Sequence, residues 1–172
     1  MTASAIQRGG LAIRQGDPER GVKLLEEALK IANSSGYTMV VTQYMVNLAE
    51  GLVALGRTAR ALAVLDQVTA RIEASGEHLH MPELRRLRGE ALAQAGSDEA
   101  HRALCASLEC ARNQDALAWE LRTATSLARL LARRGSSKEG TDLLAGVYGR
   151  FREGFGNAGF APMQAHGDTV TP

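Results

Sequence analysis

A glycine that returns at nearly constant spacing is the feature that most limits what this chain can fold into. Gly16, Gly56, Gly96 and Gly135 lie 40, 40 and 39 residues apart, and each separates two apolar stretches. A second series lies midway between them and comprises Gly36, Gly76 and Gly156, with Gln114 and Asp115 where a glycine is missing. In a chain of 172 residues this spacing indicates an array of internal repeats.

Other positions keep a fixed register relative to the first glycine series. The residue seven positions before each glycine is glycine or alanine, and the residue four positions before is apolar. A leucine follows each glycine by eight or nine positions. These columns are Gly9, Ala49, Gly89 and Ala128; Ala12, Leu52, Leu92 and Leu131; Leu25, Leu65, Leu104 and Leu144. The small column would allow two helices to cross closely.

Each repeat is predicted to hold two helices joined by a tight turn. Leu25, Ala28 and Leu29 show helical spacing, and Asp17 before Pro18 is a typical helix start. The glycines supply the left-handed backbone that ends a helix. One hairpin cannot bury both of its faces, so hairpins must stack. The predicted fold class is therefore all-α, an α-solenoid of about four antiparallel helical hairpins around one continuous apolar core.

These repeats predict one helical domain over residues 1–155. Its four repeats are expected at about residues 1–36, 37–76, 77–115 and 116–155. The segment 156–172 is rich in glycine, proline and small polar residues, and we expect it to be a disordered tail. The last hairpin would then lack a capping helix, and the first is short, so both ends are expected to be trimmed.

The repeat pattern resembles the tetratricopeptide-repeat (TPR) family. Small residue, leucine, glycine, then alanine and leucine occur at Ala49, Leu52, Gly56, Ala61 and Leu65. A second copy matches through Gly89, Leu92, Gly96 and Leu104. The usual TPR is about 34 residues long, so the helices here would be about a turn longer. The resemblance covers roughly residues 3–155 and implies a TPR-like superhelix.

Three later segments, 82–96, 118–135 and 143–155, resemble the C-terminal repeat region of large bacterial multidomain regulators. In those proteins the resemblance implies a P-loop ATPase module, with an adenylate or guanylate cyclase or a winged-helix DNA-binding domain as in LuxR-like regulators. The sequence contains no Walker pattern. We therefore expect this chain to be the repeat portion of such a regulator alone.

In TPR arrays the first helix of each pair lines a concave groove, which the resemblance extends to this chain. Counting 13, 10, 6 and 2 residues back from each turn glycine marks the inward face. The predicted partner-binding residues are Gln43, Glu50, Glu83, Arg86, Glu90, Arg122, Arg129 and Arg133. Because arginine binds carboxylates bidentately, the groove would suit an acidic segment or a C-terminal carboxylate.

A plainer interpretation of the same residues stays open. The arginine-rich segments 85–90 and 131–135 are typical of solvated helix faces with nearby acidic partners such as Glu90 and Glu120. Trp119 lies one turn before the predicted groove face, and we expect it to pack between hairpins rather than to anchor a partner.

Patterns that suggest chemistry lack the necessary context. The G-x-G-x-x-G at 154–159 follows a predicted helix instead of a strand, which argues against a dinucleotide site. His78 and His80 lack further ligands for zinc. Cys105 and Cys110 are five residues apart on one predicted helix and point in different directions, so we expect two free thiols.

Charge and hydropathy narrow the function further. Twenty basic and nineteen acidic residues are spread evenly, which argues against direct nucleic-acid binding. No apolar run could span a membrane, and no signal peptide is evident, so a cytoplasmic location is expected.

We therefore expect a non-enzymatic protein-interaction module without a cofactor or metal, whose partner is a protein or peptide. Two alternatives stay open. One is a segment that senses a small ligand and regulates an ATPase, cyclase or DNA-binding module elsewhere. The other is self-association into a homodimer through uncapped ends.

Overall fold

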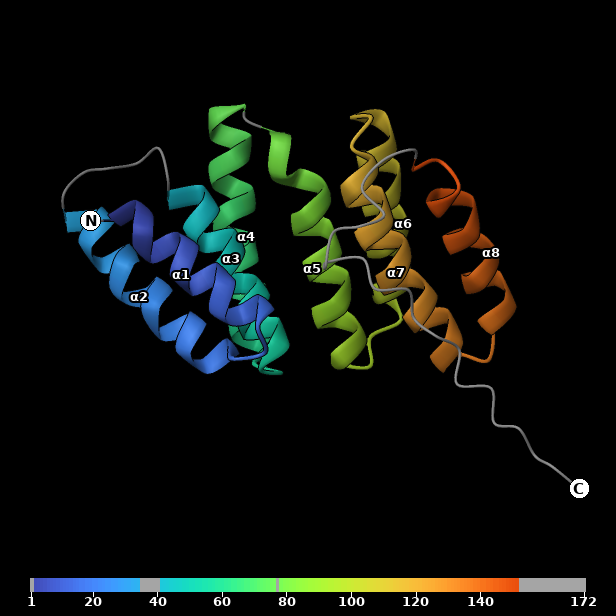
Figure 1. Ribbon diagram of the computed structural model, residues 1–172, viewed down its shortest axis with the longest axis horizontal. Helices are drawn as coiled ribbons and strands as arrows, with labels where there is room; N and C mark the ends of the chain where they lie inside the picture. The colour runs from blue at the N-terminus through green and yellow to red at the C-terminus, as the bar shows by residue number, and fades with distance from the viewer. Residues whose placement is uncertain (1, 35–40, 77, 152–172) are drawn as a thin grey trace, which may run out of the picture.

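The computed structural model describes residues 2–34, 41–76 and 78–151, and every regular element in these ranges is a helix (Figure 1). The all-α class is therefore confirmed. The helices are α1 Thr2–Arg14, α2 Pro18–Ser34, α3 Val41–Ala54, α4 Thr58–Ser75, the 3-10 helix η1 His78–His80, α5 Met81–Gln94, α6 Glu99–Asn113, α7 Leu117–Arg133 and α8 Ser137–Tyr148. The segment predicted as a disordered tail and the 154–159 motif lie outside the described residues.

The four glycines of the first series end α1, α3, α5 and α7, as predicted. Gly56 has φ +67°, and the N–H of Arg57 donates to the carbonyl of Leu52 at 2.9 Å. This is the hydrogen bond of a Schellman motif, in which a left-handed residue satisfies the last carbonyls of the helix. The other three turns repeat the same bond, so each glycine joins the two helices of one hairpin.

The second series ends the other helices of the pairs where the structure describes it. Gly76 follows α4 with φ +73°. After α6, Asp115 takes the left-handed conformation with φ +51°, and Ala116 donates to the carbonyl of Ala111 at 2.9 Å. Asp115 thus fills the place of the missing glycine. Gly36 and Gly156 lie outside the described residues.

The small column brings paired helices together. A β-carbon on Gly89 of α5 would lie 2.6 Å from Cγ of Leu104 on α6, and one on Gly9 would lie 2.7 Å from Cγ of Leu25. Each leucine therefore packs directly on the backbone of the partner helix. Both contacts show the close helix crossing that the small column predicted.

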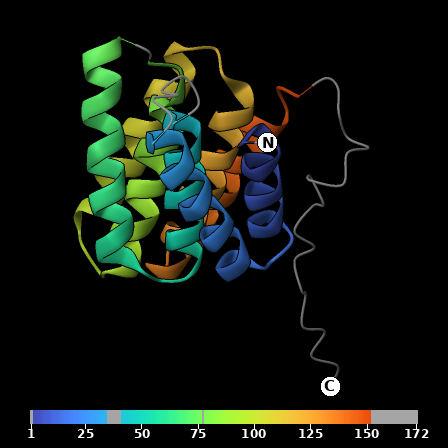
Figure 2. The same cartoon turned by 90° about the vertical axis from the view of Figure 1, so that its left-hand side faces the viewer.

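The hairpins follow one another in chain order, from α1 at one end of the molecule to α8 at the other (Figure 1), and Figure 2 views the molecule from the end that holds α1 and α2. Each helix contacts the next, and α1, α3, α5 and α7 also contact one another in that order. In the described ranges, the extensive backbone contacts between helices thus lie within a hairpin or between neighbouring hairpins.

The prediction of one continuous apolar core is wrong. Among the described residues, the buried apolar side chains form two clusters, one contributed by α1 to α5 and the other by α6 to α8, with the partly buried Leu92 and Ala93 of α5 packed against the second. Between them, α5 and α7 bring polar groups together, because Glu83, Arg86 and Ser126 are buried there. An apolar core cannot continue through a region filled by hydrogen-bonded charges.

Candidate functional site

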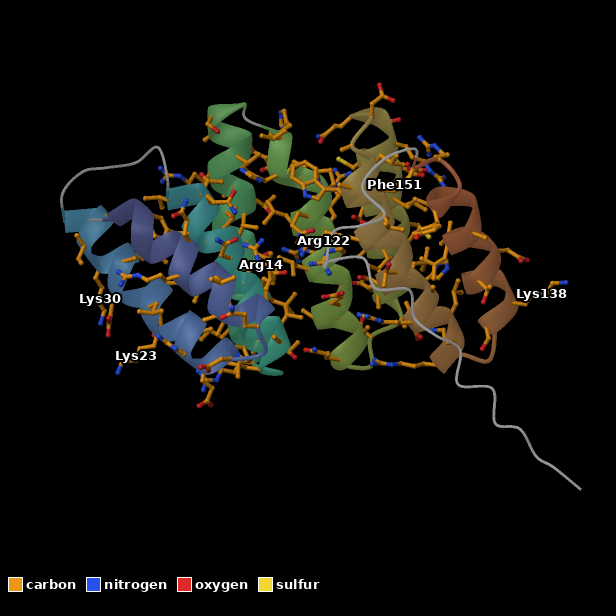
Figure 3. The ribbon with its side chains drawn as sticks, in the orientation of Figure 1. Arg14, Lys23, Lys30, Arg122, Lys138 and Phe151 are labelled. Atoms are coloured by element: carbon orange, nitrogen blue, oxygen red, sulfur yellow. The ribbon has the colours of Figure 1, made fainter. Side chains whose placement is uncertain are left out.

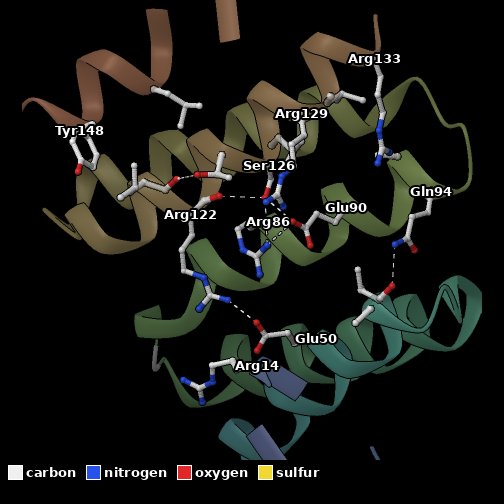
Figure 4. Close-up of a pocket in the computed structure, with 18 of the residues that line it drawn as sticks. Arg14, Glu50, Arg86, Glu90, Gln94, Arg122, Ser126, Arg129, Arg133 and Tyr148 are labelled. Carbon is white, nitrogen blue, oxygen red and sulfur yellow. Dashed lines mark hydrogen bonds and ion pairs between the residues drawn. The ribbon is translucent and has the colours of Figure 1, made fainter. Parts of the chain in front are cut away.

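A hollow of about 880 Å³ lies along the first helices of the hairpins. It is lined by α1, α3, α5, α7 and α8, with one residue from α6. Six of the eight predicted partner-binding residues lie around it, namely Glu50, Arg86, Glu90, Arg122, Arg129 and Arg133 (Figure 4). Gln43 and Glu83 do not line it. Gln43 donates to Oδ1 of Asn47 at 2.9 Å, and Glu83 is buried.

Arg86 is buried, and its guanidinium donates four hydrogen bonds. Nε and Nη2 donate to the two carboxylate oxygens of Glu83 at 2.8 and 2.7 Å, and Nη1 donates to Glu90 at 2.6 Å and to Ser126 at 3.3 Å. Only 7% of the Arg86 side chain and 5% of the Glu83 side chain are exposed. Arg86 therefore reaches the hollow as part of a buried network that already uses four of its five N–H donors.

Ion pairing outweighs burial in setting the pKa values of Glu83 and Arg86. Burial by itself would raise the pKa of Glu83, but hydrogen bonds and charge from Arg86, with further charge from Arg122 and His80, hold its pKa below the ordinary value. Burial would lower the pKa of Arg86, whereas Glu83 and the neighbouring glutamates raise it. Both groups are therefore charged at neutral pH.

Arg122 links three hairpins. Its Nη2 lies 2.6 Å from Oε1 of Glu50 on α3 and 2.9 Å from Oε1 of Glu83 on α5. The Arg122 side chain is 43% exposed and lies at the edge of the hollow. Unlike Arg86, this guanidinium is accessible, but two carboxylates already occupy it.

Arg129 and Arg133 differ from both. They are exposed, they line the hollow from α7, and neither forms a hydrogen bond or an ion pair with any residue that the structure describes. Arg14 lines the hollow from α1, where its Nε donates to the carbonyl of Gly10 at 3.1 Å. The lining holds five arginines and two glutamates, a formal charge of +3. Three of these guanidinium groups, those of Arg14, Arg129 and Arg133, have no carboxylate partner among the described residues.

Arg14 and Gln94 were missed as candidates, although the register points to them. Both lie two residues before a turn glycine, as do Ala54 and Arg133, and all four residues line the hollow. Gln94 donates to the carbonyl of Val53 at 2.9 Å. The rule that selected Arg133 would have selected Arg14 if it had been applied to the first repeat.

The plainer interpretation also describes some of these residues. Arg88 pairs with Asp66, Arg134 lies 3.7 Å from Asp98, and Arg86 pairs with Glu90. The arginine-rich segments therefore divide between paired surface positions and the hollow.

Glu120 does not pair with the arginine-rich segments 85–90 and 131–135, next to which it was considered as an acidic partner. It is buried, and it accepts from Arg112 at 2.8 Å and from Arg150 at 2.7 Å. Arg150 follows α8, so this buried carboxylate ties the end of the last hairpin to α7.

The aromatic and cysteine side chains that were considered for binding or chemistry pack within the helical array. Trp119 packs against His80, with ring centroids 6.0 Å apart, as expected for packing between hairpins. Cys105 and Cys110 are both free, and burial, with charge from Glu109 and Glu139, raises the pKa of Cys105. Across the described ranges, no three His, Cys, Asp or Glu side chains are grouped so that they could hold a metal.

Comparison of the chain with protein-family models, curated proteins and solved structures gives no match. The TPR resemblance therefore stays an interpretation of the repeat pattern. Within the described ranges, no helix combines the length and the apolar character needed to cross a bilayer.

Proposed function

We propose that this chain is a non-enzymatic interaction module that binds an acidic segment of a partner protein in the hollow. The proposal includes a TPR-like α-solenoid, for which the recurring Schellman turns and the chain-order packing of the hairpins are the support. The function follows from the hollow and its charge rather than from the fold alone.

Arg129 and Arg133 carry the proposal. Two exposed guanidinium groups on one face of α7 line a cavity, and no described residue neutralises them. A partner carboxylate would gain charge-assisted, bidentate hydrogen bonds there without displacing an internal one. Arg14 would add a third contact from α1.

The walls of the hollow favour a peptide over a bare anion. Ile13, Val53, Leu121, Leu130 and Leu144 line it beside the charged groups. A peptide could place its acidic side chains on the arginines and its apolar side chains on these walls. Charged groups would then set the register while apolar contacts add affinity.

Fluorescence anisotropy with fluorescein-labelled hexaglutamate tests the proposal. The double variant Arg129→Glu/Arg133→Glu is expected to weaken binding by at least about tenfold, because two attractive contacts become repulsive. The control is Lys23→Glu/Lys138→Glu, which makes the same change in net charge on outward-facing side chains (Figure 3). Equal affinity of the two double variants would overturn the proposal.

A small anionic molecule is the second candidate. A hollow of 880 Å³ with apolar walls and convergent polar groups lies within the size range of ligand pockets. Glutarate titrated by calorimetry distinguishes the two candidates. Tight binding of glutarate together with weak binding of hexaglutamate would favour ligand sensing.

Regulation of an ATPase, cyclase or DNA-binding module, and self-association, stay predictions. Leu11 of α1 is 52% exposed, whereas the residues in the same column of the later repeats, Gly51, Ala91 and Leu130, are buried, so Leu11 is a candidate for end-to-end contact. Light scattering against concentration tests this: a Leu11→Gln variant is expected to associate less if the end of α1 forms the contact.

A further inference from the structure

The three arginines that α7 presents to the hollow are not equivalent. Arg129 and Arg133 have no partner among the described residues, whereas Arg122 holds the carboxylates of Glu50 and Glu83. An acidic segment lying along α7 would therefore meet two open guanidinium groups and one that is already occupied (Figure 4).

The two carboxylates on Arg122 are held very differently. Glu83 is 5% exposed and also forms two hydrogen bonds with Arg86, so it is fixed in place. Glu50 is 20% exposed and lines the hollow, and Arg122 is its only hydrogen-bond or ion-pair partner in the described part of the chain, although its charge also acts on Arg86. Glu50 is thus the carboxylate that can leave.

We propose that Glu50 is an internal competitor for the partner: it occupies Arg122 in the free protein, and a carboxylate of the bound acidic segment exchanges with it. This rests on the proposed function and adds a regulatory step to the same site. The exchange replaces one carboxylate on Arg122 by another and releases Glu50 into the hollow, so its net cost is small. It also breaks the only ion pair between α3 and α7 in the described ranges.

The length of the ligand decides whether exchange occurs. Arg122 and Arg133 are eleven residues apart on one helix, which at about 1.5 Å per residue is about 16 Å. An extended hexapeptide can span this distance, since each residue adds about 3.3 Å. Glutarate is far too short, so it can bind at Arg129 and Arg133 without reaching Arg122.

The test measures anisotropy of fluorescein-labelled hexaglutamate on Glu50→Gln and Glu50→Asp. Both variants are expected to bind it about two- to fivefold more tightly than the wild type, the range of a partly exposed ion pair. Glu50→Asp retains the charge but shortens the reach to Arg122, so its gain reports competition and not net charge. Glutarate affinity is expected to stay unchanged in both.

An Arg122→Gln background is the decisive control. If Glu50 acts through Arg122, then Glu50→Asp, which keeps the charge, has no effect on hexaglutamate binding there. A similar gain in that background, or no gain in either single variant, would overturn the competition. Glu27→Gln on the outer face of α2 controls for removal of one negative charge, and circular dichroism checks that each variant is folded.

Failure of this inference is distinguishable from failure of the proposed function. If Arg129→Glu/Arg133→Glu weakens binding but the Glu50 variants change nothing, the hollow binds acidic segments without exchange. If the arginine variants bind hexaglutamate like their control, the proposed function itself fails. Binding by Glu50→Gln but not by the wild type would show complete occlusion of the site by Glu50.

Discussion

Helix α5 packs against apolar side chains of α3 and α4, whereas its contacts with α7 include buried polar side chains. Towards α3 and α4, its Leu84, Leu87 and Ala91 join the apolar cluster of the first two hairpins. Towards α7, Arg86 donates to Ser126. At the N-terminal end of α5, Ser107 of α6 donates to the carbonyl of Pro82 at 2.7 Å and lies 2.8 Å from Oγ1 of Thr123.

The two sides of α5 share one repeat register but differ in how their contacts contribute to stability and fix geometry. An apolar interface stabilises through burial and tolerates small shifts. A buried ionic interface gains little net stability, because desolvation offsets the attraction, but it demands a defined geometry. Arg86 and Glu90 of α5 also line the hollow, so the buried ionic contacts between α5 and α7 form part of the wall of the proposed binding site.

The largest expected effect comes from breaking the polar side. Glu83→Ala leaves Arg86 buried with one carboxylate fewer and removes a partner of Arg122, and we expect a loss of about 3–5 kcal/mol in the free energy of unfolding. Urea denaturation at neutral pH measures it. Glu27→Ala, an exposed glutamate without a partner among the described residues, is expected to change stability by less than about 0.5 kcal/mol.

A double variant sharpens the comparison. Glu83→Leu/Arg86→Met replaces the buried pair by apolar side chains and is expected to recover most of the loss, because neither charge is then left alone. If Glu83→Ala costs under about 1 kcal/mol, or if the double variant is less stable than either single one, the two sides of α5 are not distinguished in this way.

The second prediction concerns pH. The pKa of Glu83 is lowered in the folded protein, so its contribution to stability is fully present above the ordinary value of 4.5 and is lost as pH falls below it towards the folded pKa. The difference in unfolding free energy between the wild type and Glu83→Gln is therefore expected to shrink at pH 3.5 relative to pH 7. The corresponding difference for Glu27→Gln should stay flat, and a Glu83 difference independent of pH would contradict the pairing with Arg86.

The register of small, leucine and glycine columns was enough to predict the hairpins. It placed the turns at Gly56 and its equivalents, and even the substitute for a missing glycine near Asp115. A left-handed helix end depends on the identity of one residue, so it can be predicted from the sequence. The division of the core was not predictable in the same way, because Glu83, Arg86 and Ser126 are buried only through their contacts with one another.

The sequence predicted which helix face lines the hollow, but not which residues on that face form ion pairs with one another. Counting from the turn glycines found Arg129 and Arg133, and a consistent count would have added Arg14. It could not show that Arg122 reaches Glu50, 72 residues earlier, because that contact depends on how far three hairpins turn relative to one another. Ser126 was missed since its column holds Asn47 and Leu87, which have no common character.

The smallest expected effects are on stability, at the left-handed turn residues Asp115 and Gly56. Asp115 holds φ +51° with a β-carbon, so Asp115→Gly is expected to stabilise the protein by about 0.5–1 kcal/mol. Gly56→Ala places a β-carbon at φ +67° and is expected to destabilise by about 1 kcal/mol, although no atom lies close enough to clash. Thermal denaturation by circular dichroism can resolve both changes.

Gly146→Ala separates backbone conformation from the mere addition of a methyl group. Gly146 lies on the exposed face of α8, has no left-handed conformation and also has open space around it. Alanine there should stabilise the helix by about 0.5–1 kcal/mol. If Gly56→Ala and Gly146→Ala shift the melting temperature in the same direction, the left-handed turn is not what makes the glycine recur, and the physical basis of the 40-residue register would have to lie in packing instead.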